Sequence, residues 1–400
     1  MLHFFYTYYQ LPNIKISGAT QFQILSAERY RGQIIPFSCL YVTSNPYFRK
    51  IKESLPEIDQ SKLKTMNASQ AEAVKAHNSF PIELKSLGEN AVNSIQTTFE
   101  DKEDVNIVVI NGIGSGFGDN YVGLGAMQRL QILLAPLKVN FHLMQRTNIR
   151  VAPVYMRESN IYLHNNCMSL KAFFKMDYFV NLTGMLGLPE FDKLPLLHFM
   201  ARSFQVNSQS SIEQLQPKLT LDPVKLNSLQ YAIKSHFKQQ TRPIVLFHPQ
   251  ASSPVRSIKK VFADGIIGSL IAHGFNVISA IPYDFTADEF ASFDELSNDI
   301  DDLLHIAACS DAVVSVGTVL YHLAAALDKP TILLPSVRAD YESGQILPNV
   351  KAWVPEDSKE LIIDKHKSRD EEDMAVAEQI WKNINPQELS VFLLNMLARA

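Results

Sequence analysis

Two short polar segments hold most of the residues that could bind a charged ligand. The first runs from His248 to Lys260, and it combines two adjacent hydroxyls with three cations: Ser252, Ser253, Arg256, Lys259 and Lys260. Hydroxyls and cations together suit a diphosphate, whose negative charge must be stabilised when it leaves. The same residues are also typical of a solvated basic helix start, so both interpretations stay open.

The second segment is a turn that follows an apolar run. Asp311–Val316 is short and β-branched, as are strands that a parallel sheet buries on both faces. Gly317 and Thr318 end this predicted strand, and Tyr321–Leu327 is predicted as a helix. Such a turn offers free backbone N–H groups and the positive end of a helix dipole, where anions bind. Thr318 and His322 could therefore hydrogen-bond phosphate oxygens, although a single histidine there is more often structural.

A glycine-rich loop, residues 112–119, follows another apolar run, Val105–Ile110. It fits neither the dinucleotide fingerprint G-x-G-x-x-G nor a P-loop. Asp119 stands where the next helix begins, so it is either an N-cap or a general base that accepts a proton from an attacking hydroxyl. Three neighbours that could shape an acceptor loop are Gly116, Gly118 and Asn120.

Asp284 follows a further predicted strand, Asn276–Ala280. Its carboxylate could accept hydrogen bonds from ribose hydroxyls, or it could be an ordinary acid of a surface loop. Because each strand is followed by a predicted helix, the pattern indicates α/β structure with parallel sheets. The tail from Asp370 onward is predicted as two helices that Pro386 separates.

Composition excludes several classes of protein. The chain has 400 residues, 46% hydrophobic and 20% charged, which is typical of a globular protein with two or three domains. Its net charge of −4 gives no electrostatic footprint for nucleic acid. Three cysteines lie far apart, so we expect neither disulfides nor a metal site built from cysteines. The expected location of the protein is therefore the reducing cytoplasm. The first residues lack the features of a signal peptide, and no apolar run is long enough to span a membrane.

In this order the motifs resemble those of the bacterial heptosyltransferase family, glycosyltransferase family 9. The matching segments are Gly118-Asp119 after a strand, His248-Pro-Gln-Ala-Ser252 followed by Arg256, and Gly317–Ala326. The resemblance covers roughly residues 105–385. It implies the GT-B fold, in which two Rossmann-like domains face each other across a cleft. We therefore expect an accessory region at 1–104, an acceptor domain at 105–235, a nucleotide-sugar domain at 236–385 and a C-terminal helix at 386–400.

The resemblance also implies an activity. It is inverting, metal-independent transfer of a heptose-like sugar from a nucleotide diphosphate donor, such as ADP-heptose, to a hydroxyl of lipopolysaccharide or protein, with no further cofactor. Asp119 would be the base, Arg256 would hold the diphosphate, and Asp284 would hold the ribose or base side. Thr318 and His322 would line the donor pocket. Since the family includes heptosyltransferases that modify autotransporter adhesins, residues 1–104 would recognise a protein acceptor or mediate homo-oligomer assembly.

Two positions depart from the family's late signature. Gly317 stands where the family has Asp, so a carboxylate that would hold the donor sugar or order the loop is missing. Val319 stands where the family has Gly, which places a bulky residue where close backbone approach is expected. These departures predict a donor other than ADP-heptose or a weakened site.

Other functions remain possible at this point. The chain could be a sugar-nucleotide epimerase or hydrolase, or a non-catalytic binding or scaffold protein, which the absence of an acid at Gly317 favours. A Rossmann dehydrogenase is disfavoured by the broken glycine fingerprint. It is disfavoured also by Arg146, which stands near the end of a strand where NAD enzymes have an acid.

Overall fold

The computed structural model divides the chain into two compact units. The first unit comprises residues 1–185 and 200–210, and the second comprises residues 186–199 and 211–400. The residues that the structure describes are 2–7, 29–30, 33–34, 39–44, 49, 52–53, 63–110, 117–144, 152–155, 158–164, 167–182, 191, 194–297, 299–365 and 370–399.

The first unit is built on a five-stranded parallel sheet. Its middle strand, β7, is buried over Ile107–Ile110, so the apolar run of the sequence faces core on both sides of the sheet. The strands, in spatial order, are β6 (Ile82–Glu83), β11 (Tyr178–Asn181), β7 (Asp104–Ile110), β8 (Lys138–Met144) and β9 (Ile161–His164).

An antiparallel sheet of the first unit joins distant parts of the chain. Its order is β10 (Cys167–Ser169), β4 (Cys39–Ser44), β1 (Leu2–Thr7) and β5 (Leu63–Thr65). A short antiparallel pair is formed by β2 (Arg29–Tyr30) and β3 (Gln33–Ile34). Since β6 belongs to the parallel sheet, residues before 104 contribute strands to both larger sheets.

Short helices accompany these sheets, and one long helix follows β7. The long helix is α5 (Phe117–Leu133). The others are α3 (Ala68–Lys75), the 3₁₀ helix η1 (Leu84–Asn90), α4 (Ala91–Thr98), α6 (Ala152–Tyr155), α7 (Leu170–Phe173), η3 (Asn207–Gln209) and α9 (Leu196–Ser203), whose first residues belong to the second unit.

The second unit is built on a six-stranded parallel sheet. Its strands follow the Rossmann order 3-2-1-4-5-6, which places the first strand, β12, beside the fourth, β15. In spatial order they are β14 (Phe290–Ala291), β13 (Asn276–Ser279), β12 (Ile244–His248), β15 (Ala312–Val316), β16 (Thr331–Leu334) and β17 (Val350–Ala352).

Helices connect these strands. They are α10 (Ile212–Leu215), α11 (Pro223–His236), the 3₁₀ helix η4 (Pro254–Arg256), α12 (Lys260–Ala272), α13 (Phe293–Leu296), α14 (Asp302–Cys309), α15 (Val319–Ala326), α16 (Arg338–Ile346), η5 (Glu356–Leu361), α17 (Glu371–Asn383) and α18 (Pro386–Leu397).

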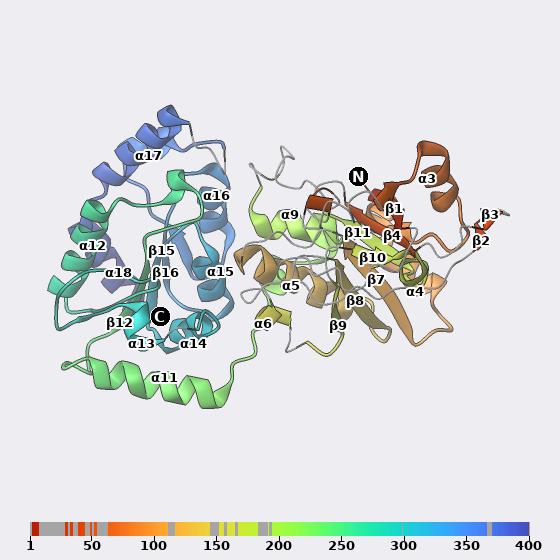
Figure 1. Ribbon diagram of the computed structural model, residues 1–400. Coiled ribbons are helices and arrows are strands. Elements are labelled where there is room, and N and C mark those ends of the chain that lie inside the picture. Colours follow the sequence, from red (N-terminus) through yellow and green to blue (C-terminus); the bar gives the residue numbers. More distant parts are fainter. Residues whose placement is uncertain are drawn as a thin grey trace. The chain divides into compact units, whose positions relative to one another are not determined.

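These helices cover both faces of the sheet, with α12 and α18 on one side and α15 on the other (Figure 1). Val245 and Phe247 of β12 pack into the core formed with α12, α17 and α18. Leu246, between them, packs into the core formed with α11, α14 and α15. The alternation of a strand sends successive side chains to opposite faces, so one apolar run serves two cores.

The predicted α/β class with two Rossmann-like sheets is confirmed. The predicted strands at 105–110, 138–143, 178–182, 243–248, 276–280, 311–316 and 331–335 all form, within a residue or two of the predicted ends. The two C-terminal helices divided at Pro386 also form. That the two sheets face a common cleft stays a prediction of the resemblance.

The second unit offers a test of how closely α16 packs on the sheet. A Cβ atom on Gly344 would lie 2.6 Å from the Cβ and 2.7 Å from the backbone N of Ala352 in β17. We therefore expect Gly344→Ala to lower the free energy of unfolding by about 1–3 kcal/mol, as overpacking does. Urea unfolding followed by circular dichroism measures it.

Gly268 in α12 provides the matched control. A Cβ there meets nothing within 4 Å, and an interior helical glycine generally gains stability on conversion to alanine. Gly268→Ala should raise the free energy of unfolding by up to about 1 kcal/mol. Equal effects of the two substitutions would contradict the close contact of α16 with β17.

Candidate functional site

The second unit has its candidate site where β12 and β15 end side by side. This is the point at which the strand order reverses, and open α/β sheets bind ligands at the carboxyl ends of the strands there. His248, the last residue of β12, is paired in register with Ser315 of β15. The loop after β12 and the turn after β15 are therefore neighbours.

A chain of short hydrogen bonds ties the two strand ends together. His248 Nδ1 and Thr318 Oγ1 are 2.7 Å apart, and Thr318 Oγ1 is 3.1 Å from Ser315 Oγ. Thr318 is also the N-cap of α15, because its hydroxyl accepts a hydrogen bond from the Leu320 N–H at 3.3 Å. The predicted turn is thus confirmed as a capped helix start beside the β12 loop.

Arg256 lies in the segment that follows β12, and hydrogen bonds within this segment hold its conformation. Pro254 starts η4, and the Ile258 N–H donates to the Pro249 carbonyl at 2.8 Å. The Ser257 hydroxyl accepts from the Ala251 N–H at 3.0 Å. Arg256 is buried, and its Nη1 donates to the carbonyl of Gly317 in the turn after β15. One guanidinium therefore joins the two predicted segments.

Four buried polar atoms of this region accept or donate no hydrogen bond within the described part of the chain. They are Ser253 Oγ, Arg256 Nε, His322 Nδ1 and Asp340 Oδ2. A buried polar group without a partner costs about 1–3 kcal/mol, so native proteins keep few of them without a use. Their gathering at a sheet switch point indicates a site for a polar ligand.

Burial sets the charges of the site. It lowers the pKa of His248 to about 4 and, together with the nearby Arg256, lowers the pKa of His322 to about 3. Both imidazoles are therefore neutral at pH 7. Burial raises the pKa of Asp340, while Arg256 acts in the opposite direction. Arg256 is the cation that this site can offer to an anion.

Asp340 corrects the expectation that the site lacks a carboxylate. Gly317 has none, but a Cβ atom at that position would lie 1.6 Å from Asp340 Oδ2. A carboxylate from α16 thus occupies the space that a side chain at 317 would enter. Tyr321, which is also buried, donates its hydroxyl to Asp340 Oδ1 at 3.4 Å.

Val319 does not take up ligand space at the turn in the way we expected. Its side chain packs, partly buried, against the hydrophobic core shared with α11 and α14. The first residue of a helix can point into the core while its N–H remains at the helix end. The expectation that Val319 blocks close approach is therefore wrong.

Asp340 and Tyr321 were missed by sequence analysis. A usable signal for Asp340 was its place six residues after β16, at the same edge of the sheet as His248 and Gly317. Tyr321 is one residue before His322 within an apolar helix, so its type alone did not distinguish it from core.

The other predicted donor-binding residues lie around this cluster. Ser252 is exposed in the β12 loop, and Asp284 is exposed after β13. Lys259 pairs with Glu378 of α17. Lys260 pairs with Asp264 at 3.0 Å and donates to the Asp284 carbonyl at 2.7 Å. Their roles toward a donor stay predictions, and both lysines would have to leave carboxylates to reach a phosphate.

Asp119 lies in the first unit, at the corresponding switch point between β7 and β11. It is partly exposed in the first turn of α5, after Phe117 and Gly118, so the N-cap interpretation is wrong. A carboxylate there still gains from the helix dipole. Asn120 is buried and accepts from the Tyr155 hydroxyl at 2.7 Å, whereas Gly116 lies outside the described residues. The role of Asp119 as a base stays a prediction.

One group of acidic and histidine side chains in the described ranges has metal-ligand spacing: Asp301, Asp302 and His305. The ammonium of Lys225 lies 3.3 Å from Asp301 and 3.0 Å from Asp302. Burial acts to lower the pKa of Lys225, but its hydrogen bonds to Asp299, Asp302 and Asp301 outweigh this and raise it. A cation of the protein already neutralises these carboxylates.

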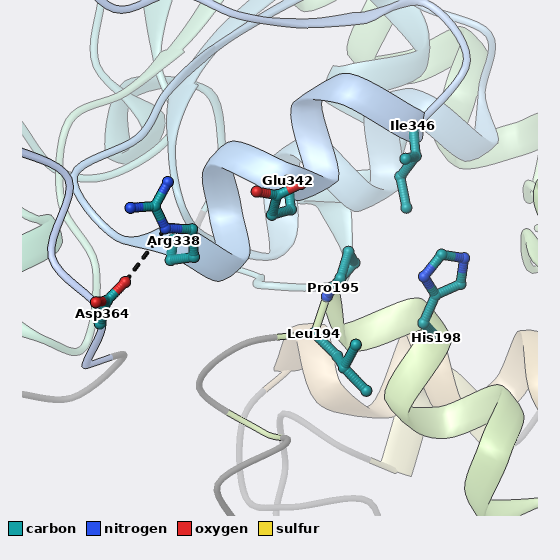
Figure 2. A pocket seen from close by; sticks show the side chains of 7 residues that line it. All are labelled: Leu194, Pro195, His198, Arg338, Glu342, Ile346 and Asp364. Carbon is teal, nitrogen blue, oxygen red and sulfur yellow. Dashed lines mark hydrogen bonds and ion pairs between the residues drawn. The ribbon is translucent and has the colours of Figure 1, made fainter. Parts of the chain in front are cut away.

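The second unit also contains a cavity of about 460 Å³ beside α16 (Figure 2). Arg338, which pairs with Asp364 at 3.2 Å, stands on its wall. The helical period places Arg338 and Glu342 on the face of α16 opposite to Asp340. The residues that line the cavity are Leu194, Pro195, His198, Arg338, Glu342, Ile346 and Asp364.

No protein-family model matches the chain, and no curated protein matches it. Solved structures do. ADP-heptose lipopolysaccharide heptosyltransferase II from E. coli is 14% identical, with 74% of this chain and 99% of that chain covered and a TM-score of 0.47. This chain is similar in structure to glycosyltransferases. TibC, an iron-containing dodecameric glycosyltransferase from enterotoxigenic E. coli, is 15% identical over 74% of this chain and 78% of that chain, with a TM-score of 0.45.

A glycosyltransferase family 9 protein from Veillonella parvula is also similar. It is 9% identical over 74% of this chain and 98% of that chain, with a TM-score of 0.46. Among the helices that the structure describes, none has the length and apolar character needed to cross a membrane.

The buried state of His248 predicts a pH dependence. Its pKa is about 4 in the folded chain and about 6.5 in an unfolded one, so between these values the unfolded chain binds more protons. The contribution of neutral His248 to the free energy of unfolding is therefore complete above pH 6.5 and falls as the pH drops toward 4. Between pH 7 and pH 4.5, the free energy of unfolding of His248→Gln, measured in urea, should fall by about 2–3 kcal/mol less than that of the parent. The same loss in both proteins would contradict a neutral, buried His248.

Proposed function

We propose that this chain is a glycosyltransferase that uses a nucleoside diphosphate sugar as its donor. The observation that carries this proposal is the buried cluster at the switch point of the second sheet. There Arg256, the N-terminus of α15 and unpartnered buried polar atoms lie together. A diphosphate oxygen could accept from Arg256 Nε, and another from the first N–H groups of α15.

The proposed reaction needs stabilisation of a leaving group and removal of one proton. The acceptor hydroxyl attacks the anomeric carbon, the bond from that carbon to the phosphate oxygen breaks, and the nucleoside diphosphate leaves with the bonding electrons. Attack from the opposite face inverts the anomeric carbon. Arg256 and the dipole of α15 would stabilise the leaving charge without a metal ion, and Asp119 would accept the hydroxyl proton.

The finer assignments follow the sequence resemblance. ADP-heptose or a similar sugar nucleotide is the proposed donor, and a hydroxyl of lipopolysaccharide or protein is the proposed acceptor, in the cytoplasm. Residues 1–104 would bind a protein acceptor or mediate homo-oligomer assembly. An epimerase or hydrolase would turn over the donor without any acceptor, which mass spectrometry of donor-only reactions would detect.

Nucleotide binding tests the role of Arg256. Hydrogen bonds to charged groups contribute about 1.5–3 kcal/mol, so Arg256→Gln should weaken binding of ADP by about 10- to 100-fold in isothermal titration calorimetry. The control is Lys238→Gln, which removes an exposed cation that pairs with Asp288 and should leave ADP binding unchanged. Unchanged affinity in Arg256→Gln would contradict a diphosphate site at this cluster.

Asp119→Asn tests the proposed base. Because an amide cannot accept the hydroxyl proton, sugar transfer should fall by about 100- to 10,000-fold while ADP affinity stays within twofold. Asp101→Asn, which alters an exposed acid of the same unit, should keep full transfer. Full activity of Asp119→Asn in the same transfer assay would remove Asp119 from the mechanism.

A further inference from the structure

The position of Asp340 is fixed by three features of the second unit. Gly344 lets α16 approach the backbone of Ala352. The Tyr321 hydroxyl donates to Asp340 Oδ1 at 3.4 Å. The absence of a side chain at Gly317 leaves the carboxylate the space beside the β15 turn, since a Cβ there would lie 1.6 Å from Oδ2. The fold thus holds a buried carboxylate at the switch point.

The pairing of Asp340 with Arg256 is incomplete. Their charged atoms are 3.8 Å apart, which is longer than a charge-assisted hydrogen bond of about 2.7–2.9 Å. Arg256 Nη1 donates to the Gly317 carbonyl instead. Asp340 Oδ2 accepts no hydrogen bond, and Arg256 Nε donates none, from the part of the chain that the structure describes.

A buried ion pair with unused hydrogen-bonding capacity is a poor stabilising device, because desolvation of both charges is then not offset. One class of ligand could make the missing hydrogen bonds of both groups at once. A hydroxyl would donate to Asp340 Oδ2, and an anionic oxygen of the same ligand would accept from Arg256 Nε. A polyol linked to a phosphate has this arrangement, as does the sugar–phosphate part of a sugar nucleotide.

We propose that Asp340 is a specificity-determining residue that binds a hydroxyl of the transferred sugar, taking the place in space that a side chain at 317 would have. This inference rests on the proposed function, since it assigns the sugar end of the same donor site. Asp340 acts through a hydrogen bond to the sugar, and the nucleoside diphosphate itself does not need it.

The test compares each nucleotide with its sugar nucleotide in calorimetry. The pairs are ADP and ADP-heptose, UDP and UDP-glucose, and GDP and GDP-mannose. The wild-type chain should bind one sugar nucleotide more tightly than its nucleotide. Asp340→Asn should reduce that preference at least tenfold and leave nucleotide affinity within twofold. The control is Asp364→Asn, an exposed acid of the same unit, which should keep the preference.

An exchange of the two positions separates contact from folding. Gly317→Asp alone forces a side chain into the Asp340 carboxylate, and Asp340→Gly alone removes that carboxylate, so each should lose the preference. The double variant Gly317→Asp/Asp340→Gly returns a carboxylate to the same space from the turn after β15. It should recover at least tenfold of the preference over Asp340→Gly, with an unliganded melting midpoint no lower than that of either single variant.

The outcomes divide as follows. A wild-type chain that binds none of the six probes would overturn the proposed function, and this inference with it. A chain that binds a nucleotide but prefers no sugar nucleotide would keep the donor site and overturn the role of Asp340. An equal loss of nucleotide and sugar nucleotide in Asp340→Asn would reduce Asp340 to a partner of Arg256 and overturn it too. Failure of the double variant to recover the preference would do the same.

Discussion

The pairing of β12 with β15 is the contact on which the candidate site depends. It brings the end of the first strand of the Rossmann order against the end of the fourth, and no local sequence feature could do this. His248 and Thr318 are 70 positions apart in the sequence, yet their side chains are 2.7 Å apart. The carboxyl ends of parallel strands lie at the same edge of the sheet, so the loops that follow neighbouring strands lie next to each other.

Sequence patterns predicted the strands and turns at this edge of the sheet, but not every residue of the candidate site. Apolar runs identified the strands, and Gly317 and Thr318 identified the turn after one of them, because burial of a parallel strand demands an uninterrupted apolar run. Arg256, Thr318 and His322 were predicted as site residues because they follow strand ends closely. Asp340 was not, because it sits inside a helix and reaches the site only through tertiary packing of α16 on β17. Lys259 and Lys260 show the opposite case, in which cations beside the motif pair with Glu378 and Asp264.

The candidate site contains one buried cation and one buried carboxylate. Burial keeps His248 and His322 neutral, so a single guanidinium carries the positive charge, and one carboxylate stands 3.8 Å from it. In a poorly solvated place both charges act strongly on whatever enters, and neither is saturated by the protein. A ligand bound here would have to satisfy donor and acceptor together, so ligands with matching geometry would be favoured.

Gly317 and Asp340 cannot vary independently of each other. Any larger residue at 317 collides with the acid at 340, and the loss of that acid frees the space that a side chain at 317 would enter. In an alignment of homologous chains the two columns should therefore covary, glycine with an acid and an acid with a small residue. A comparison that scores each column alone would count the carboxylate as lost, although α16 supplies it in place of the turn after β15.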